Sequence, residues 1–196
     1  MRSFLQFNFL NAAILCLALA APSLAGAATL EGQSFEDDIR LAHNDLHLNG
    51  LGLRARFIIK GYVAGLYLKE KAATQQAVVA MPGPKRLQMR MLLSVGPEEF
   101  NKALVAGIRK NASEAELARL NERIAQFEHS ITSIGKILKG DVVNLDFVPG
   151  LGMTLSVNGV VKGPVIAGAD FYEAVLGIFV GEHPVDEKLK KGLLGL

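Results

Sequence analysis

The order of strand-like and helix-like segments constrains the fold of this chain most strongly. Strand patterns come first, two long helical stripes follow, strand patterns return, and the chain closes on helical segments. In chain order the segments span residues 35–48, 53–68, 74–81, 87–95, 97–110, 113–134, 141–161, 167–181 and 184–194. Because elements of one kind are grouped, the order predicts an α+β domain, with helices packed on one face of an antiparallel sheet.

Local signals support several of these boundaries. Apolar and polar residues alternate along residues 87–95, as in a half-buried strand. Pro97 and the acids after it suit a helix start. Ser113 and Glu116 have the spacing of a capping box, in which each side chain satisfies a free backbone donor.

Turn signals divide the strand regions. Asn49-Gly50 predicts a turn, and Asn158-Gly159 between apolar runs is a strong hairpin signal. Residues 53–68 are rich in β-formers and predict one strand, in which Gly61 and Gly65 indicate a bulge or a close backbone approach.

The first 28 residues have the pattern of a signal peptide. Arg2 is followed by an apolar run over residues 9–21, which is too short to span a bilayer as a helix. Small residues then surround an expected cleavage site after Ala25 or Ala27. We expect a periplasmic domain of residues 29–196; lipidation of Cys16 and an uncleaved buried helix are the alternatives.

Composition narrows the function classes. The 196-residue chain has 21 Lys and Arg against 19 Asp and Glu, so a basic surface for nucleic acid is not indicated. Its single cysteine, Cys16, lies in the leader, so we expect no disulfide and no cysteine-based metal site in the mature protein. No segment of the mature chain predicts a membrane span.

Catalytic and metal motifs are not evident. His43 and His47 have the spacing of helical zinc ligands, but their segment is strand-like, so we expect no metal. Gly50-x-Gly52 lacks the third glycine of a phosphate-binding loop, and no nucleophile motif occurs. We therefore predict no catalytic residues and no cofactor.

The segment after Arg54 is more informative. In one regular strand, Arg54, Arg56, Ile58, Lys60 and Tyr62 would share a face. That face is either solvated or the wall of a cleft that holds an anion beside an apolar tail. Arginine suits a carboxylate because its planar fork offers paired donors.

These residues carry a resemblance. LNGLGLRARFIIKGYVAGLYL resembles the first core strands of the chalcone isomerase-like family, and GADFYEAVLGIFVGEHPVDEKLKKGLLG resembles its closing helices. The likeness covers residues 45–196 and is greatest to the bacterial exported branch. It implies an open-faced sandwich, in which a curved antiparallel sheet carries a layer of helices on one face, with a ligand cleft between. The plant enzymes cyclise chalcones, whereas other members bind fatty acids without known catalysis.

The resemblance matches only some of the family's site residues in this sequence. The family's arginine corresponds to Arg54, and the enzymes' threonine in the following strand falls at Tyr62, where the fatty-acid-binding branch is similar in having tyrosine. The enzymes' tyrosine, lysine and asparagine fall at Phe100, Ala103 and Gly107. The resemblance thus argues against chalcone cyclisation, because these donors would stabilise developing charge. A register shift could bring only Asn101 or Lys102 near.

We therefore expect a non-catalytic periplasmic protein that binds a small amphipathic acid, with a fatty acid as the candidate. Arg54 would pair with the carboxylate, Tyr62 would donate a hydrogen bond, and Met89, Met91 and Phe100 would line the tail site. The alternatives are an isomerase or lyase with another substrate, and a structural or partner-binding envelope protein. The lysines of the last helix leave weak contact with a membrane surface open.

Overall fold

The computed structural model describes residues 26–196, so the predicted leader lies almost wholly outside the described residues. Within this part of the chain, seven strands form one antiparallel sheet in which each strand pairs with the next in sequence. The strands are β3 (Asp38–Leu41), β4 (Asn44–Arg56), β5 (Ile59–Leu68), β6 (Lys85–Met91), β7 (Val142–Val148), β8 (Gly152–Val157) and β9 (Val160–Ile166).

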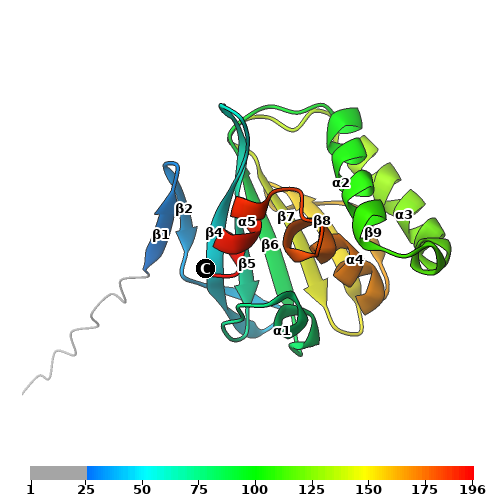
Figure 1. Cartoon of the computed structure of the whole chain (residues 1–196), viewed down its shortest axis with the longest axis horizontal. Helices are drawn as coiled ribbons and strands as arrows, with labels where there is room; N and C mark the ends of the chain where they lie inside the picture. Colours follow the sequence, from blue (N-terminus) through cyan, green and yellow to red (C-terminus); the bar gives the residue numbers. More distant parts are fainter. Residues whose placement is uncertain (1–25) are drawn as a thin grey trace, which may run out of the picture.

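Helices cover one face of this sheet, as Figure 1 shows. They are α1 (Gln75–Ala80), α2 (Pro97–Asn111), α3 (Glu114–Ile134), α4 (Ala169–Val180) and α5 (Glu187–Leu193). The core between the layers is aliphatic and aromatic, with Met89, Phe127 and Phe171 fully buried. The predicted α+β class and open-faced sandwich are confirmed. No helix in residues 26–196 is both long enough and apolar enough to cross a bilayer.

The helix boundaries follow the sequence signals. Pro97 occupies the first turn of α2, with Glu98 and Glu99 beside it at the positive end of the helix. The predicted capping box is formed: the Ser113 hydroxyl accepts from the Glu116 backbone, and the Glu116 carboxylate accepts from the Ser113 backbone. The two helices are therefore separated where the pattern predicted.

The expected turn at Asn49-Gly50 is wrong. Both residues lie inside β4, where the Asn49 amide exchanges hydrogen bonds with the Ala72 backbone and donates to the Leu193 carbonyl. Gly50 faces the backbone of α5 so closely that a Cβ atom would collide with it. The pair is therefore used for buried contacts, and its turn propensity is overridden.

The expected single strand over residues 53–68 is also wrong. The segment is a hairpin, with β4 ending at Arg56, β5 beginning at Ile59, and Phe57 and Ile58 forming the turn. The irregularity predicted at Gly61 is confirmed: the register shifts between Arg54 and Ala55, which leaves Gly61 as the unpaired residue of the bulge. Gly65 is a site of close packing, because a Cβ atom there would lie 2.9 Å from the Phe35 ring. Arg54 and Tyr62 therefore belong to neighbouring strands.

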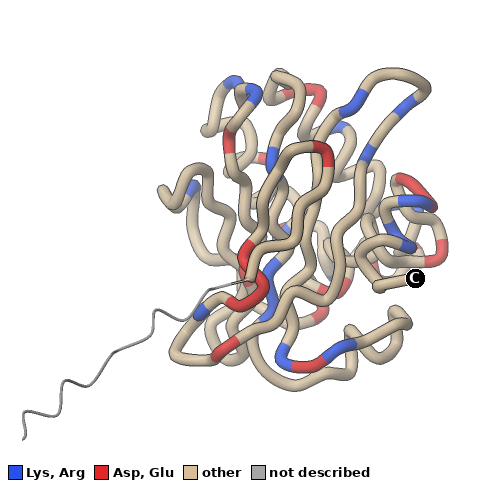
Figure 2. Tube along the Cα trace, turned by 90° about the vertical axis from the view of Figure 1, so that its left-hand side faces the viewer, with Lys and Arg blue, Asp and Glu red and all other residues tan. Residues whose placement is uncertain are grey.

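The other face of the sheet is covered in part by a separate hairpin of β1 (Ala27–Leu30) and β2 (Gln33–Glu36). Its Phe35 is buried in a second apolar cluster with Leu46, Val63 and Tyr67. The Arg90 guanidinium lies 5.0 Å from the centroid of the Phe35 ring. Figure 2, which faces this side, shows the hairpin lying across the sheet. The sheet thus has two apolar faces rather than one.

Candidate functional site

Arg54 and Tyr62 are direct cross-strand partners on β4 and β5. The five-residue face expected for one strand does not exist, because the turn at Phe57 and Ile58 lies between the two residues. Arg54 contacts the loop before α5, and Tyr62 packs against the core between the sheet and the helices. The structure therefore brings the two predicted site residues together on the helix side of the sheet.

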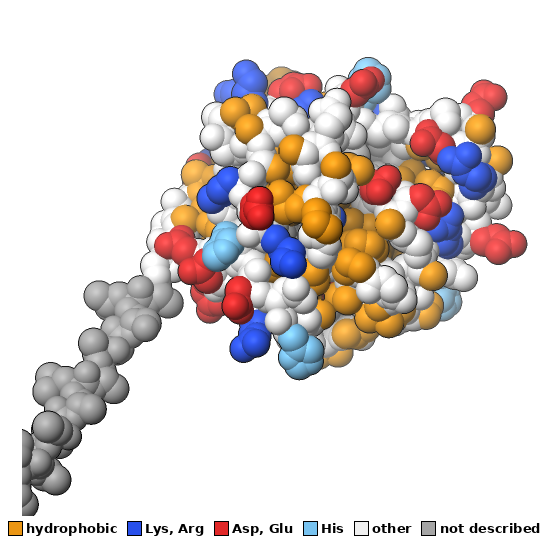
Figure 3. Space-filling model, turned by 90° about the horizontal axis from the view of Figure 1, so that it is seen from below, with side chains coloured by type: hydrophobic (Ala, Val, Ile, Leu, Met, Phe, Trp, Pro, Cys, Tyr) orange, Lys and Arg blue, Asp and Glu red, His pale blue; other side chains and the backbone are white. Residues whose placement is uncertain are grey.

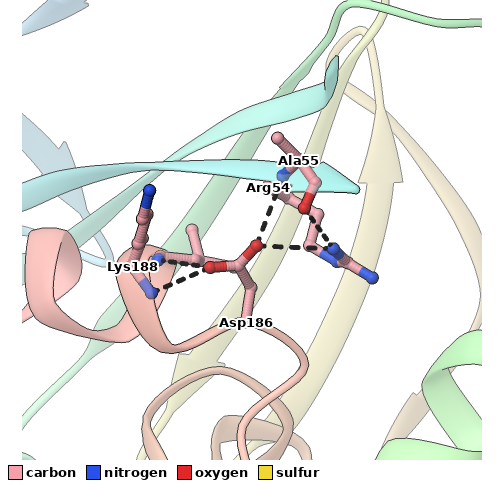
Figure 4. Close-up of polar contacts among 5 residues, drawn as sticks. Arg54, Ala55, Asp186 and Lys188 are labelled. Carbon is pink, nitrogen blue, oxygen red and sulfur yellow. Dashed lines mark hydrogen bonds and ion pairs between the residues drawn. The ribbon is translucent and has the colours of Figure 1, made fainter. Parts of the chain in front are cut away.

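A carboxylate of the chain already occupies one side of the arginine. Asp186 Oδ2 lies 3.4 Å from Arg54 Nη1 and 3.4 Å from the Ala55 backbone nitrogen. Oδ1 of the same carboxylate caps α5, accepting from the backbone of Lys188 at 2.8 Å and of Leu189 at 3.0 Å. Figure 4 shows Asp186 between β4 and α5, with the far end of the Arg54 guanidinium pointing away from it.

This ion pair is loose by the standard of its type. Charge-assisted N–H···O bonds are usually about 2.7–2.9 Å long, so 3.4 Å is a weak contact. Arg54 Nη1 also donates to the Ala55 carbonyl at 2.8 Å. Within residues 26–196 the other guanidinium nitrogens of Arg54 have no hydrogen-bond partner, and the side chain is partly exposed. The arginine is thus oriented by its own chain yet retains free donors.

The Tyr62 hydroxyl remains protonated throughout the physiological range. Burial raises the pKa of Tyr62 well above its ordinary value; the Arg54 charge opposes this shift and the Asp186 charge adds to it. Among the described residues the hydroxyl makes no hydrogen bond. A neutral phenol beside a guanidinium can donate to an anion that approaches Arg54.

The expected tail site is filled by the protein itself. Met89, Met91 and Phe100 are buried in the core between the sheet and the helices. Met91 lies directly opposite Tyr62 on the neighbouring strand. A ligand tail can therefore reach this region only if the helices and the sheet separate locally.

The positions aligned with the catalytic tyrosine, lysine and asparagine of the plant enzymes carry no hydrogen-bond donor in their side chains. Phe100 is buried, whereas Ala103 lies on the exposed side of α2, as does Lys102. Gly107 packs against Ile178 of α4 so closely that any side chain there would require a shift. A register shift does not bring Lys102 inward, and an asparagine at position 107 would not fit this helix contact.

Asp186 was missed by the sequence reasoning. The available signal was local: an aspartate directly before a short helical segment is a favoured N-cap. Its second role, at Arg54, joins residues 132 positions apart and cannot be inferred from that signal.

Lys85 was also missed. It lines an apolar hollow of about 270 Å³ at the opposite end of the sheet, together with Met81, Phe147 and Tyr172. Its Nζ donates to the Met81 carbonyl at 2.6 Å and lies 5.6 Å from the Phe147 ring centroid. Burial lowers the pKa of Lys85, and Glu173 opposes this effect. Figure 3, seen from below, shows apolar side chains gathered on this end of the molecule.

The paired histidines do not share a helix, so their spacing does not place them on one helical face. His43 lies in the turn before β4 with φ near 62°, and His47 lies on β4 with its Nδ1 2.5 Å from Asp38 Oδ1. Within residues 26–196 no three metal-binding side chains gather.

Comparison with known proteins connects this geometry to a family. The family model described as chalcone isomerase-like matches residues 27–195. The crystal structure of a fatty-acid binding protein from Arabidopsis thaliana superposes with a TM-score of 0.68 at 16% identity, covering 86% of this chain and 96% of that one. No curated protein matches this chain in sequence. At that identity the structural likeness establishes the shared fold.

Proposed function

Because the chain belongs to the chalcone isomerase-like family, we propose that it is a non-catalytic binding protein for a small amphipathic acid, with a fatty acid as the candidate ligand. One observation carries the proposal: Arg54 and Tyr62 meet on neighbouring strands, and the guanidinium already holds a carboxylate of the chain loosely. The plant protein of the same fold is named for fatty-acid binding, which supports this choice of ligand.

The polar end of the site accommodates a second carboxylate. Arginine has five N–H donors in a planar fork, and Asp186 engages Nη1 alone. A ligand carboxylate can take the free donors on the side away from Asp186, while the Tyr62 hydroxyl supplies another hydrogen bond. Asp186 then holds the guanidinium in place through its contacts with α5 and β4.

The apolar end requires a conformational change. Met91 and Phe100 fill the space that a tail would use, so binding is expected to loosen the contact between α2 and the sheet. Ligand binding should therefore change hydrogen exchange in α2 more than in α3, which packs farther along the sheet against β9.

Arg54→Ala is expected to weaken binding of a fatty acid by about tenfold or more, the scale of a lost charge-assisted hydrogen bond. Arg56→Ala is the matched control: this arginine lies two positions along β4, is exposed, and has no carboxylate within 4.0 Å among the described residues. Titration calorimetry of both variants measures the difference. Equal affinity in Arg54→Ala and wild type would remove Arg54 as the anchor.

Native mass spectrometry of the mature protein, followed by denaturing extraction, tests the proposal without a chosen ligand. We expect a co-purifying fatty acid or another small carboxylic acid. An empty protein that also ignores a panel of fatty acids would contradict acid binding. That outcome would favour a second candidate, a structural or partner-binding protein with a closed cleft, which the buried Met89 and Phe100 support.

We also propose export to the periplasm, as in the bacterial exported branch, on the pattern of residues 1–28. Strand β1 begins at Ala27, and the Gly26 carbonyl accepts from the Asp37 backbone at 3.0 Å. Cleavage after Ala25 would keep these pairings, whereas cleavage after Ala27 would remove part of β1. Intact-mass spectrometry of the periplasmic protein is therefore expected to give the mass of a chain that begins at Gly26. A mass that includes the leader would contradict export with cleavage.

A further inference from the structure

The turn between β4 and β5 has unusual chemistry for a two-residue hairpin. Phe57 has φ near 54°, a region in which bulky side chains are strained, and hairpins of this kind prefer glycine at such a position. The two turn side chains, Phe57 and Ile58, are 93% and 94% exposed. The chain uses Asn158-Gly159 for the β8–β9 turn, so favourable turn residues occur elsewhere in the same sheet. The chain therefore places exposed apolar side chains at this hairpin tip, even though the backbone at Phe57 is strained.

Exposed apolar side chains gather around this tip. Leu93 follows β6, and its backbone nitrogen donates to the Gly61 carbonyl. Leu138 precedes β7 and lies two residues before Gly140, whose backbone nitrogen donates to the Met91 carbonyl. Figure 1 shows the hairpin tip and these two connections together at one end of the molecule. We name this set the tip surface: Phe57, Ile58, Ile59, Leu93 and Leu138. It contains half of the ten exposed large apolar side chains in residues 26–196.

Basic side chains surround the tip surface. Arg56, Lys136, Lys139 and Lys188 are exposed, and none of them has a carboxylate within 4.0 Å in the described part of the chain. Lys188 borders the same groove of about 730 Å³ as Phe57 and Ile58. Figure 2 shows Lys and Arg residues on the hairpin and on the neighbouring loops at this end.

Two of the nearby acids are engaged within the protein. Glu31 pairs with Lys60 at 2.6 Å, and the Asp141 carboxylate accepts from the Leu138 backbone at 2.7 Å and from the Asn158 amide at 2.9 Å. Glu98 and Glu99 lie in the first turn of α2 and reduce the net positive charge. Glu187 is also exposed and lines the same groove as Lys188. The four free basic side chains therefore stand against three free acids, which leaves a net charge of +1 around the hairpin tip.

We propose that the tip surface docks this protein on the surface of an anionic lipid bilayer. Phe57 and Ile58 enter the boundary between headgroups and acyl chains, and the surrounding Lys and Arg side chains contact the phosphates. This surface is separate from the carboxylate anchor, although it lies at the same end of β4 and β5. Docking would bring the anchor near a source of amphipathic acids.

The double substitution F57G/I58S tests the proposal. Glycine suits the positive φ, so the variant should unfold at the same temperature as wild type or higher. Binding to vesicles of phosphatidylcholine and phosphatidylglycerol, measured by co-sedimentation, should fall by about tenfold or more when these two apolar side chains are lost. Leu151→Ser, at the β7–β8 turn of the opposite end, is the control and should bind as wild type does.

The contribution of the basic side chains to vesicle binding is tested separately. Lys139→Ala should lower vesicle binding by about fivefold, and wild type should bind vesicles of phosphatidylcholine alone more weakly. The vesicles contain no free fatty acid, so failure of acid binding leaves this result unaffected. Equal vesicle binding by wild type and F57G/I58S would overturn the proposal. A lipid-free dimer of wild type that F57G/I58S abolishes, without vesicle binding, would assign the tip surface to a second copy instead.

Discussion

Phe171→Ala is expected to lower the free energy of unfolding by about 4 kcal/mol, the scale of removing a buried aromatic side chain. Phe171 is fully buried on α4, and its ring meets the Phe127 ring of α3 edge to face, with centroids 5.7 Å apart. The substitution removes this aromatic contact and leaves a cavity between two helices and the sheet. Urea unfolding followed by circular dichroism measures the change.

Phe57→Ala is the matched control for this prediction. The same residue type is removed from an exposed turn, so the expected change in unfolding free energy is within about 0.5 kcal/mol. Because stability typically totals about 5–15 kcal/mol, Phe171→Ala should leave a folded but weakened protein. A loss comparable to that of Phe57→Ala would contradict the described packing of α4 on α3.

Gly52→Ala is expected to destabilise the protein by about 3 kcal/mol through overpacking. A Cβ atom at position 52 would collide with the backbone of Leu189, so α5 would have to move away from β4. That movement displaces the Asp186 cap and its contact with Arg54. Thermal and urea unfolding measure the loss, and acid binding should weaken in the same variant.

Gly61→Ala separates this collision from the general effect of replacing a strand glycine. A Cβ atom at position 61 would lie at an ordinary 3.5 Å from the Arg54 carbonyl, so the expected change is small. If Gly52→Ala were as mild as Gly61→Ala, the close docking of α5 on β4 would be wrong. The placement of Asp186 beside Arg54 would then lose its structural basis.

The sequence predicted those parts of the fold that depend on neighbours in the chain. The capping box at Ser113 and Glu116, the Pro97 helix start and the Asn158-Gly159 hairpin were each correct, because their partners lie within a few residues. The grouping of strands and helices also predicted the layer architecture. The periodic pattern within each segment shows which face of that segment is buried.

The failures involve contacts between distant residues. Asn49-Gly50 also has a local preference for a turn, but hydrogen bonds with Ala72 and Leu193 keep it within β4. Phe57 and Ile58 have poor turn preference and nevertheless form the turn. Asp186 is brought to Arg54 by the docking of α5, which no local pattern encodes.

The candidate site was predicted in part. Arg54 and Tyr62 were identified by family resemblance and are adjacent in the structure, whereas the expected one-strand geometry was wrong. Whether the core at Met91 is filled could not be decided from the sequence, because a sequence pattern marks a residue as buried without showing whether a ligand shares its space.

Titration calorimetry of the delipidated mature protein with octanoic acid and with octanol tests the central claim most directly. Both ligands present the same chain length, and only the acid offers a carboxylate to Arg54. We expect the acid to bind about tenfold more tightly or better, the scale of a charge-assisted hydrogen bond. Equal affinity for acid and alcohol, or no binding of either, would contradict a carboxylate site at Arg54 and Tyr62.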